Sequence, residues 1–267
     1  MSYYDRIASQ WHEATGHCGG PFRRLVLNDV VLSAIPSIAG SCILELGAGN
    51  GYFLPLLLRR FEEEVPSRIV ITDASTELLA VAEREFRVEN GEYVRLDVRA
   101  RYPFESGTFD LVLAIMVFNE VSTGGLRKAL AECRQVLKDS GQLIAVVAHP
   151  DFVENLMQRG ELRGNNKGQV TMPTTASLRV PVVRRTAAAY DVCLGAFGWE
   201  YEVEDIYPNR RVLRERPELK AAAGLPLARM FKCRKTPSQP KRDTRARSAG
   251  TRPQEHRVGA PAGKSSS

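Results

Sequence analysis

The chain has 267 residues, of which 43% are hydrophobic, so its length and composition suit one large domain with a buried core. No uncharged apolar run reaches membrane-spanning length and the N-terminus lacks a signal-peptide layout, so we expect a cytoplasmic protein without a membrane segment. The formal net charge of +6 resides mainly in residues 236–267, so it does not indicate nucleic-acid binding by the folded part.

The first predicted elements are two helices. Residues 3–15 show loose helical spacing of apolar residues, and the glycines and proline that follow break the pattern. Residues 22–35 repeat this spacing, and Pro36 ends the second helix. Residues 42–46 then predict a short buried strand.

A glycine-rich turn follows this strand. Gly47, Gly49 and Gly51 stand at alternate positions ahead of an apolar helical segment. Glycine lets the backbone approach a ligand without an intervening Cβ, and the first N–H groups of the next helix are unpaired. Ordinary turns also use glycine, so the turn alone is a weak indication of a nucleoside or dinucleotide site. Tyr52 stands where a dinucleotide turn would carry its third glycine.

Acidic residues end the next two predicted strands. Residues 68–72 form a strand that ends at Asp73, and residues 92–96 form a strand that ends at Asp97. An acidic residue about twenty positions beyond such a turn binds ribose hydroxyls in nucleotide-binding folds. Alternatively, Asp73 caps the helix that begins at Ser75, and Asp97 is an ordinary turn residue.

Two more strands complete the pattern. Residues 109–116 are almost entirely apolar, as in a parallel strand covered on both faces, and lead to Glu120. A helix over residues 123–138 ends at a Ser-Gly pair, and residues 142–148 form a strand that ends at His149. The alternation predicts an α/β fold, with a doubly wound, Rossmann-like, mostly parallel sheet. Ligands bind at the carboxyl ends of such strands, where all the residues named above would meet.

The pattern changes after residue 150. A short helix, a loop and an extended segment are expected over residues 151–159, 160–175 and 178–183. A helix, a strand and an antiparallel closing strand are expected over residues 186–197, 198–206 and 227–234. Residues 236–267 are rich in Pro, Ser, Arg and Gly and are expected to be disordered.

The segment Glu45-Leu-Gly-Ala-Gly-Asn-Gly, with acidic residues at 73 and 97 in register, resembles the first motifs of class I S-adenosylmethionine-dependent methyltransferases. The resemblance covers about residues 3–235 and is tightest over 42–149. It implies a domain over residues 1–235, followed by a basic tail over 236–267. The implied parts of the domain are an N-terminal helical lid (1–40), a cofactor-binding core (41–149), a substrate cap (150–185) and a closing helix and hairpin (186–235).

The cofactor that the resemblance implies is S-adenosyl-L-methionine. Glu45 with the glycines would hold its methionine end, Asp73 its ribose and Asp97 its adenine amino group, while the N–H of Val98 meets the ring. The full implied set is Glu45, Gly47, Ala48, Gly49, Gly51, Asp73, Ala74, Asp97, Val98 and Met116. Many relatives carry histidines after the fourth strand, where this chain has Asn119-Glu120. The metal-dependent branch places an aspartate at the strand end, where this chain has apolar residues, so no metal is expected.

Two residues are candidates for a general base. His149 is the first, because it is the only histidine at a strand's carboxyl end and titrates near neutral pH. Alternatively, His149 merely turns the chain before Pro150. Glu120 is the second, although it could equally cap or orient.

Several other side chains have a simpler expected role. Tyr4 and His12 are expected to pack rather than to react, and Trp11 is expected to be a core or lid aromatic. Three arginines, Arg179, Arg184 and Arg185, could meet an anionic substrate, although a solvated basic face is the simpler interpretation.

The sequence thus predicts an enzyme that transfers a methyl group to the oxygen, nitrogen or carbon nucleophile of a small molecule by in-line displacement. A nicotinamide-dependent oxidoreductase uses the same sheet but is disfavoured by Tyr52. The alternative outside enzymology is a cofactor-binding regulatory protein whose tail contacts RNA. Five scattered cysteines without a Cys-x-x-Cys pair favour a reducing compartment and argue against a disulfide framework or a zinc site.

Overall fold

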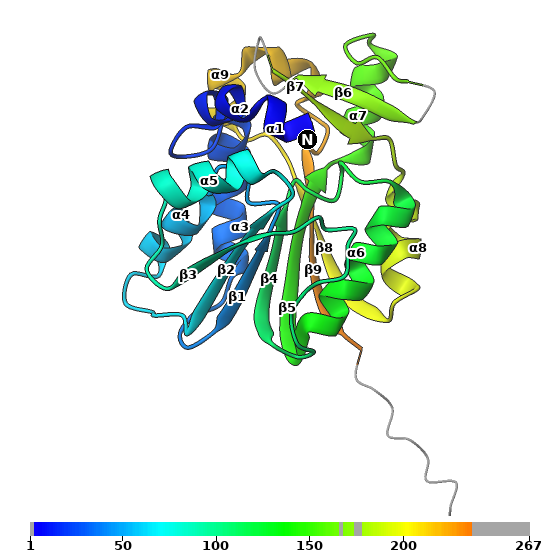
Figure 1. Cartoon of the computed structure of the whole chain (residues 1–267). Helices are drawn as coiled ribbons and strands as arrows, with labels where there is room; N and C mark the ends of the chain where they lie inside the picture. The colour runs from blue at the N-terminus through cyan, green and yellow to red at the C-terminus, as the bar shows by residue number, and fades with distance from the viewer. Residues whose placement is uncertain (1–2, 166–167, 174–177, 237–267) are drawn as a thin grey trace, which may run out of the picture. The chain divides into compact units, whose positions relative to one another are not determined.

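The computed structural model describes residues 3–165, 168–173 and 178–236. Within these residues a seven-stranded sheet has the order β3-β2-β1-β4-β5-β9-β8 (Figure 1). Its strands are β1 Cys42–Leu46, β2 Arg68–Asp73, β3 Gly91–Arg95, β4 Phe109–Ile115, β5 Leu137–Ala148, β8 Trp199–Ile206 and β9 Ala228–Lys235. A separate antiparallel hairpin pairs β6 Gln169–Pro173 with β7 Arg179–Val183.

The sheet is mostly parallel, which confirms the predicted fold class. Strands β1 to β5 pair in parallel, whereas β9 is antiparallel to both of its neighbours, β5 and β8. The strand order reverses between β1 and β4, because the chain leaves β1 toward β2 on one side and returns to β4 on the other. A crevice outside the carboxyl ends of the strands is expected at such a reversal.

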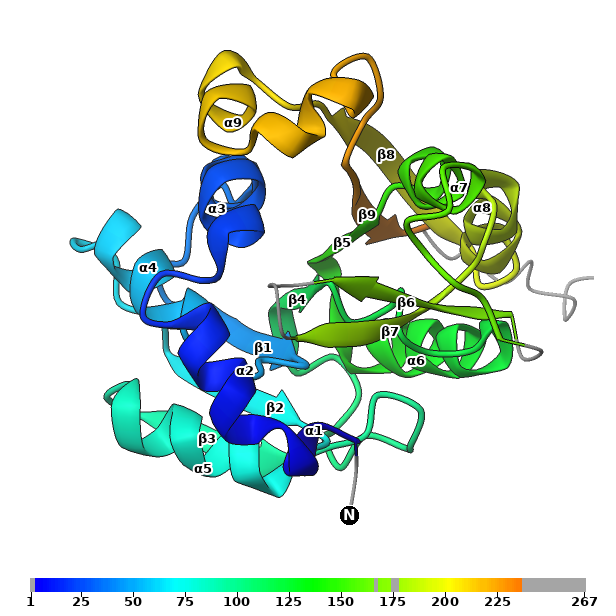
Figure 2. The same ribbon diagram turned by 90° about the horizontal axis from the view of Figure 1, so that it is seen from above.

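Helices cover both faces of the sheet. One apolar cluster joins α3, α4 and α5 to the first face, and a second joins α6 and α8 to the other. The remaining helices and the β6–β7 hairpin are arranged around one end of the sheet (Figure 2). The helices are α1 Tyr3–Arg6, α2 Ala8–Thr15, α3 Asn28–Ala34, α4 Phe53–Arg60, α5 Thr76–Glu85, α6 Thr123–Val136, α7 Pro150–Gln158, α8 Ala187–Gly195 and α9 Arg210–Glu215. A π-helical turn, Arg23–Leu27, precedes α3, and a 3-10 helix, Pro217–Ala222, follows α9.

Three predicted elements differ from the structure. The single helix predicted over residues 3–15 is interrupted at Ile7, where φ is −112° and ψ is 10°. The helix predicted to end at a Ser-Gly pair already ends at Val136, and Gly141 lies inside β5. A Cβ at Gly141 would lie 2.9 Å from the Phe109 carbonyl oxygen, so this glycine serves close strand packing rather than a helix end. The loop predicted over residues 160–175 contains β6.

The predicted tail lies, from residue 237 onward, outside the described residues. In the part of the chain that is described, no helix is long and apolar enough to cross a membrane. All five cysteines fall within this part, and each is an unpaired thiol.

Candidate functional site

A cavity of about 260 Å³ lies at the carboxyl ends of β1, β2 and β4, and we call it the strand-end pocket. Tyr3, Tyr4 and Trp11 of α1 and α2 form part of its wall, so the N-terminal helices close over it. Seven of the predicted binding residues also line it, namely Gly47, Gly49, Asp73, Ala74, Asp97, Val98 and Met116.

The N-terminal helices are attached on two sides of this pocket. The Ser75 hydroxyl, at the start of α5, donates to the Asp5 carboxylate over 2.7 Å. The Tyr3 hydroxyl donates to the Arg179 carbonyl oxygen over 2.6 Å, which joins α1 to the β6–β7 hairpin. Residues distant in the sequence therefore enclose one space.

The glycine turn needs glycine for two separate reasons. Gly47 and Gly49 have φ of +63° and +60°, in the left-handed region that side chains disfavour. A Cβ on Gly49 would also lie 2.9 Å from Trp11 Nε1. Gly51 lines neither this pocket nor the adjoining cavities described below, and a Cβ there would lie 2.7 Å from that of Ala82. Gly51 therefore allows α5 to approach the turn closely, and we do not assign it to a ligand.

Asp73 ties the turn to the next strand. One carboxylate oxygen accepts from the Gly49 N–H and the other from the Ser75 N–H, each over 2.8 Å. Burial raises the pKa of Asp73, although these backbone N–H groups oppose the rise. The Ser75 hydroxyl itself caps α5 by accepting from the Leu78 N–H. Asp73 is therefore not the residue that caps this helix, and it lines the strand-end pocket.

Asp97 has a charged neighbour. The Arg99 guanidinium lies 2.5 Å from the Asp97 carboxylate and lowers its pKa. Arg99 also lines the strand-end pocket. A ligand that hydrogen-bonds to Asp97 would therefore meet a carboxylate whose charge is already partly compensated.

A small recess lies behind the glycine turn and contains Glu45, Ala48 and Arg23. Glu45 is 3% exposed, and one of its carboxyl oxygens has no hydrogen-bond partner among the described residues. Burial, and then the charge of Asp73, raises the pKa of Glu45 to about 8. A buried carboxyl without a partner is costly, so this recess is suited to a ligand that carries a cationic group.

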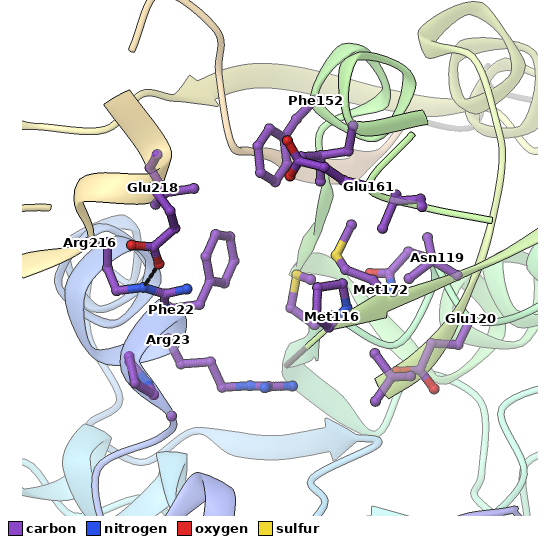
Figure 3. Close-up of a pocket in the computed structure, with 18 of the residues that line it drawn as sticks. Phe22, Arg23, Met116, Asn119, Glu120, Phe152, Glu161, Met172, Arg216 and Glu218 are labelled. Atoms are coloured by element: carbon purple, nitrogen blue, oxygen red, sulfur yellow. Dashed lines mark hydrogen bonds and ion pairs between the residues drawn. The ribbon is translucent and has the colours of Figure 1, made fainter. Parts of the chain in front are cut away.

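A second cavity of about 160 Å³ adjoins the first, and we call it the cap pocket (Figure 3). Its walls are largely apolar and come from α7, the hairpin and the segment after α9. They include Phe22, Phe152, Leu156, Leu162, Met172, Val180, Val182 and Leu219. Four residues line both pockets, namely Trp11, Arg23, Met116 and Glu120. The two pockets therefore meet at these four residues.

Met116 has an unusual backbone conformation at this junction. Its φ is +62°, a left-handed value that is uncommon for any residue other than glycine. Its N–H donates to the Val146 carbonyl oxygen over 2.8 Å, which holds the end of β4 against β5. Non-glycine residues in this region carry strain and cluster at functional sites.

Glu120 is the titratable group at the junction. Its carboxyl reaches solvent only in part, and burial raises its pKa to about 8. The Tyr4 hydroxyl and the Arg23 guanidinium interact with it and oppose this rise. A carboxyl poised near neutral pH can accept a proton during a reaction.

His149 is not brought together with these residues. It lines neither pocket, and its side chain is 2% exposed. Its Nδ1 accepts from the Asp151 N–H and caps α7, while its Nε2 lies 3.3 Å from an Asp205 carboxylate oxygen. Burial lowers its pKa. This geometry favours the alternative in which His149 turns the chain before Pro150, so we do not assign it to the chemistry.

Sequence reasoning gave no role to Arg23 and favoured a solvated face for Arg185. Arg23 stacks on the Trp11 ring, with its guanidinium carbon 5.0 Å from the ring centroid, and forms no ion pair with the described residues. Its only sequence signal is its place directly after the break between the first two helices. Arg185 is buried rather than solvated, and donates to the Phe118 and Val121 carbonyl oxygens over 3.1 and 2.7 Å. It thereby fastens the loop that carries Glu120.

The fold and this pocket define a class of protein, namely a doubly wound α/β domain with a nucleoside-type site at the strand ends. Residues 43–141 match a family model described as "Methyltransferase domain". A malonyl-[acyl-carrier protein] O-methyltransferase from Coxiella burnetii is 31% identical over 43% of this chain and 36% of its own length. A demethylmenaquinone methyltransferase from Thermotoga maritima is 30% identical over 45% of this chain and 49% of its own length. The matches thus span less than half of either relative.

A solved structure of an S-adenosylmethionine-dependent methyltransferase from Mesorhizobium loti has the same fold, with a TM-score of 0.60. The two sequences are 21% identical, and the match covers 77% of this chain and 96% of that one. Residues 43–141 therefore form a domain of a methyltransferase family, and the chain shares the fold of S-adenosylmethionine-dependent methyltransferases. The cofactor of this family is S-adenosylmethionine.

The residues of the site fit this cofactor. The unpartnered Glu45 carboxyl oxygen suits its ammonium group, and Gly47 and Gly49 line the strand-end pocket with main-chain atoms alone. A Cβ at Gly47 would lie 2.6 Å from Val117 Cγ2, so this turn also packs tightly against the loop after β4.

Proposed function

We propose that the chain transfers a methyl group from S-adenosylmethionine to a small molecule held in the cap pocket. The observation that carries this proposal is the junction, where both pockets share the side chains of Trp11, Arg23, Met116 and Glu120. A donor bound at the strand ends and an acceptor bound under the cap would meet there. When bound, the cofactor supplies a methyl group that is already activated by its positive sulfur.

Each part of the cofactor has a proposed partner. Glu45 would accept from the ammonium group, and Arg23 would pair with the carboxylate, because both side chains line the recess behind the glycine turn. Asp73 would accept from the ribose hydroxyls with the lone pairs that Gly49 and Ser75 leave free. Asp97 and Val98 would bind the adenine at the far side of the pocket.

The size and shape of the cap pocket support a small-molecule acceptor. Its volume of about 160 Å³ lies beneath the β6–β7 hairpin, and its walls are mostly apolar side chains. Small-molecule sites are typically concave and apolar with a few polar groups that fix orientation. Burial of the acceptor there would exclude water and align the reacting atoms, which supplies most of the catalysis in a displacement on an activated carbon.

We assign the role of general base to Glu120. It lines both pockets, and its pKa of about 8 lets it accept a proton near neutral pH. Tyr4, whose buried hydroxyl has no partner among the described residues, lines the strand-end pocket together with Glu120. The five unpaired thiols support the cytoplasm as the compartment in which this reaction occurs.

Calorimetry tests the cofactor site, and methyl transfer tests the reaction. Wild-type protein should bind S-adenosylmethionine and its demethylated product in the strand-end pocket, and a single substitution, Gly49→Val, should abolish both. A screen with methyl-labelled cofactor and a library of small molecules should then yield a labelled product. Failure to bind either form of the cofactor would contradict the proposal.

A further inference from the structure

One polar atom of the cap pocket has no partner in the protein. Asn119 lines this pocket and is 2% exposed. Among the described residues, no group donates to its side-chain oxygen, Oδ1. A buried carbonyl oxygen without a donor costs about 1–3 kcal/mol, so a donor from outside the chain is expected.

The backbone of Asn119 is held in place. Its main-chain oxygen accepts from the Val183 N–H over 2.7 Å, which fixes the loop to the β6–β7 hairpin. Arg185 holds the same loop through the carbonyl oxygens on either side, those of Phe118 and Val121. Asn119, which lines the pocket, therefore lies in a loop that hydrogen bonds hold on both sides.

The other polar groups of the pocket are satisfied or have another role. Glu218 pairs with Arg216, and Glu161 lies 2.5 Å from Arg159. Figure 3 shows the first pair on the side of the cavity opposite Asn119. Arg23 serves the cofactor carboxylate under the proposed function. The molecule to be methylated therefore meets two groups that accept hydrogen bonds, the Asn119 oxygen and the Glu120 carboxylate, within apolar walls.

We propose that the methyl acceptor is a primary amine on an apolar body, held by Asn119 Oδ1 and the Glu120 carboxylate. A neutral primary amine has two N–H donors and one lone pair, so it can satisfy both oxygens and still direct its lone pair at the methyl group. A hydroxyl has one donor and would leave one oxygen unsatisfied. A carboxylate has none and would be repelled by Glu120.

The reaction balances with the groups present. The carbon–nitrogen bond forms as the carbon–sulfur bond breaks, and the nitrogen becomes a methylated ammonium group. Its surplus proton passes to the Glu120 carboxylate, and the sulfur product leaves as a neutral thioether. This inference rests on the proposed function, because it assumes that the cap pocket faces the methyl donor.

Three matched probes test it: 2-phenylethylamine, 2-phenylethanol and 3-phenylpropanoate. Each is titrated by calorimetry into wild-type protein saturated with S-adenosylhomocysteine, at about pH 9, where a carboxyl with a pKa of about 8 is ionised. The amine should bind at least about tenfold more tightly than the alcohol or the carboxylate, since each unsatisfied buried group costs about 1–3 kcal/mol. With methyl-labelled cofactor, only the amine should become labelled.

Two variants locate the preference. Asn119→Leu keeps the size of the side chain but removes its amide oxygen, so the preference for the amine should fall about tenfold. The affinity for S-adenosylhomocysteine should stay constant. Gln158→Leu, at an exposed residue of α7 that lines neither pocket, should keep the preference. The wild-type ranking stands even if Asn119→Leu does not fold.

The outcomes separate the two proposals. If S-adenosylhomocysteine does not bind, the proposed function itself fails. If it binds but the alcohol or the carboxylate has an affinity equal to or higher than that of the amine, the amine inference alone is overturned. The same holds if S-adenosylhomocysteine binds but no probe binds at millimolar concentration.

Discussion

The Gly49 N–H donates to the Asp73 carboxylate over 2.8 Å, so the glycine turn after β1 and the acidic end of β2 form one unit. The second carboxylate oxygen of Asp73 accepts from the Ser75 N–H, at the start of α5. Asp73 therefore shapes the strand-end pocket before any ligand arrives. A change at Asp73 should act on both the turn and the ligand.

Asp73→Ala should weaken S-adenosylmethionine binding by about 1.5–3 kcal/mol, because hydrogen bonds to a charged acceptor are lost. Asp73→Asn, which keeps one acceptor oxygen, should lose less. Calorimetry measures both affinities, and Asp139→Ala, in an exposed ion pair with Lys235, is the control. Equal binding by wild type and Asp73→Ala would refute the ribose assignment.

Gly49→Ala should weaken cofactor binding, because its Cβ would lie 2.9 Å from Trp11 Nε1 and would displace a side chain that lines the strand-end pocket. Gly107→Ala is a matched control, since Gly107 has a similar φ of +69° but no atom within 4 Å of the added Cβ. Both variants should lose about 1–2 kcal/mol of folding stability to left-handed strain. Thermal melts measure that shared cost, and calorimetry should detect a binding defect at Gly49 alone. Wild-type affinity in Gly49→Ala would show that the turn does not contact the ligand.

The cofactor-free protein should become less stable as the pH rises from about 4.5 toward 8. Protonation of Glu45 stabilises the folded state, because its folded pKa of about 8 lies above the ordinary value of 4.5. This stabilisation is complete below pH 4.5 and is lost as the pH rises through 8. Each pKa unit between the folded and the unfolded state changes the free energy of unfolding by about 1.4 kcal/mol, so the total change is a few kcal/mol. Urea unfolding across this range measures the slope, which Glu45→Gln should flatten. An unchanged slope in Glu45→Gln would assign the effect to another group.

Once an acceptor is found, the single-turnover rate should rise with pH and level off at or below about 8, because Glu120 acts as a base only when ionised. The positive sulfur of the cofactor can only move this midpoint downward. Glu120→Gln should lower the rate by roughly 10²–10⁴-fold and remove the titration. His149→Asn should leave the rate nearly constant, since His149 lines neither pocket. The reverse result would restore His149 as the base.

Arg185→Met should destabilise the fold by about 2–4 kcal/mol, since two buried carbonyl oxygens lose a charged donor. Arg184→Met provides the neighbouring control, because Arg184 forms a largely exposed ion pair with Glu154, worth less than about 1 kcal/mol. Urea unfolding of both variants gives the comparison. Similar losses in the two would show that the carbonyl contacts contribute little.

The parallel sheet and its strand-end residues could be predicted because they depend on local patterns. Apolar runs, the alternate glycines and Asp73 each carry their signal within a few residues. The catalytic role predicted for His149 stays a prediction, because position at a strand end does not reveal orientation: its ring caps α7 and lies beside Asp205. The burial of Arg185 could not be predicted because its partner Phe118 lies 67 positions away in the sequence, and the place of Arg23 in both pockets depends on the tertiary fold.

The attachment of the cap to the core uses main-chain oxygens on the core side: those of Phe118, Asn119 and Val121 accept from Arg185 and Val183. Any core loop with the same backbone path would offer the same three oxygens, whatever its side chains. These three contacts therefore depend on the path of the loop and on the guanidinium of Arg185, so side-chain changes at residues 118, 119 and 121 leave all three accepting oxygens in place.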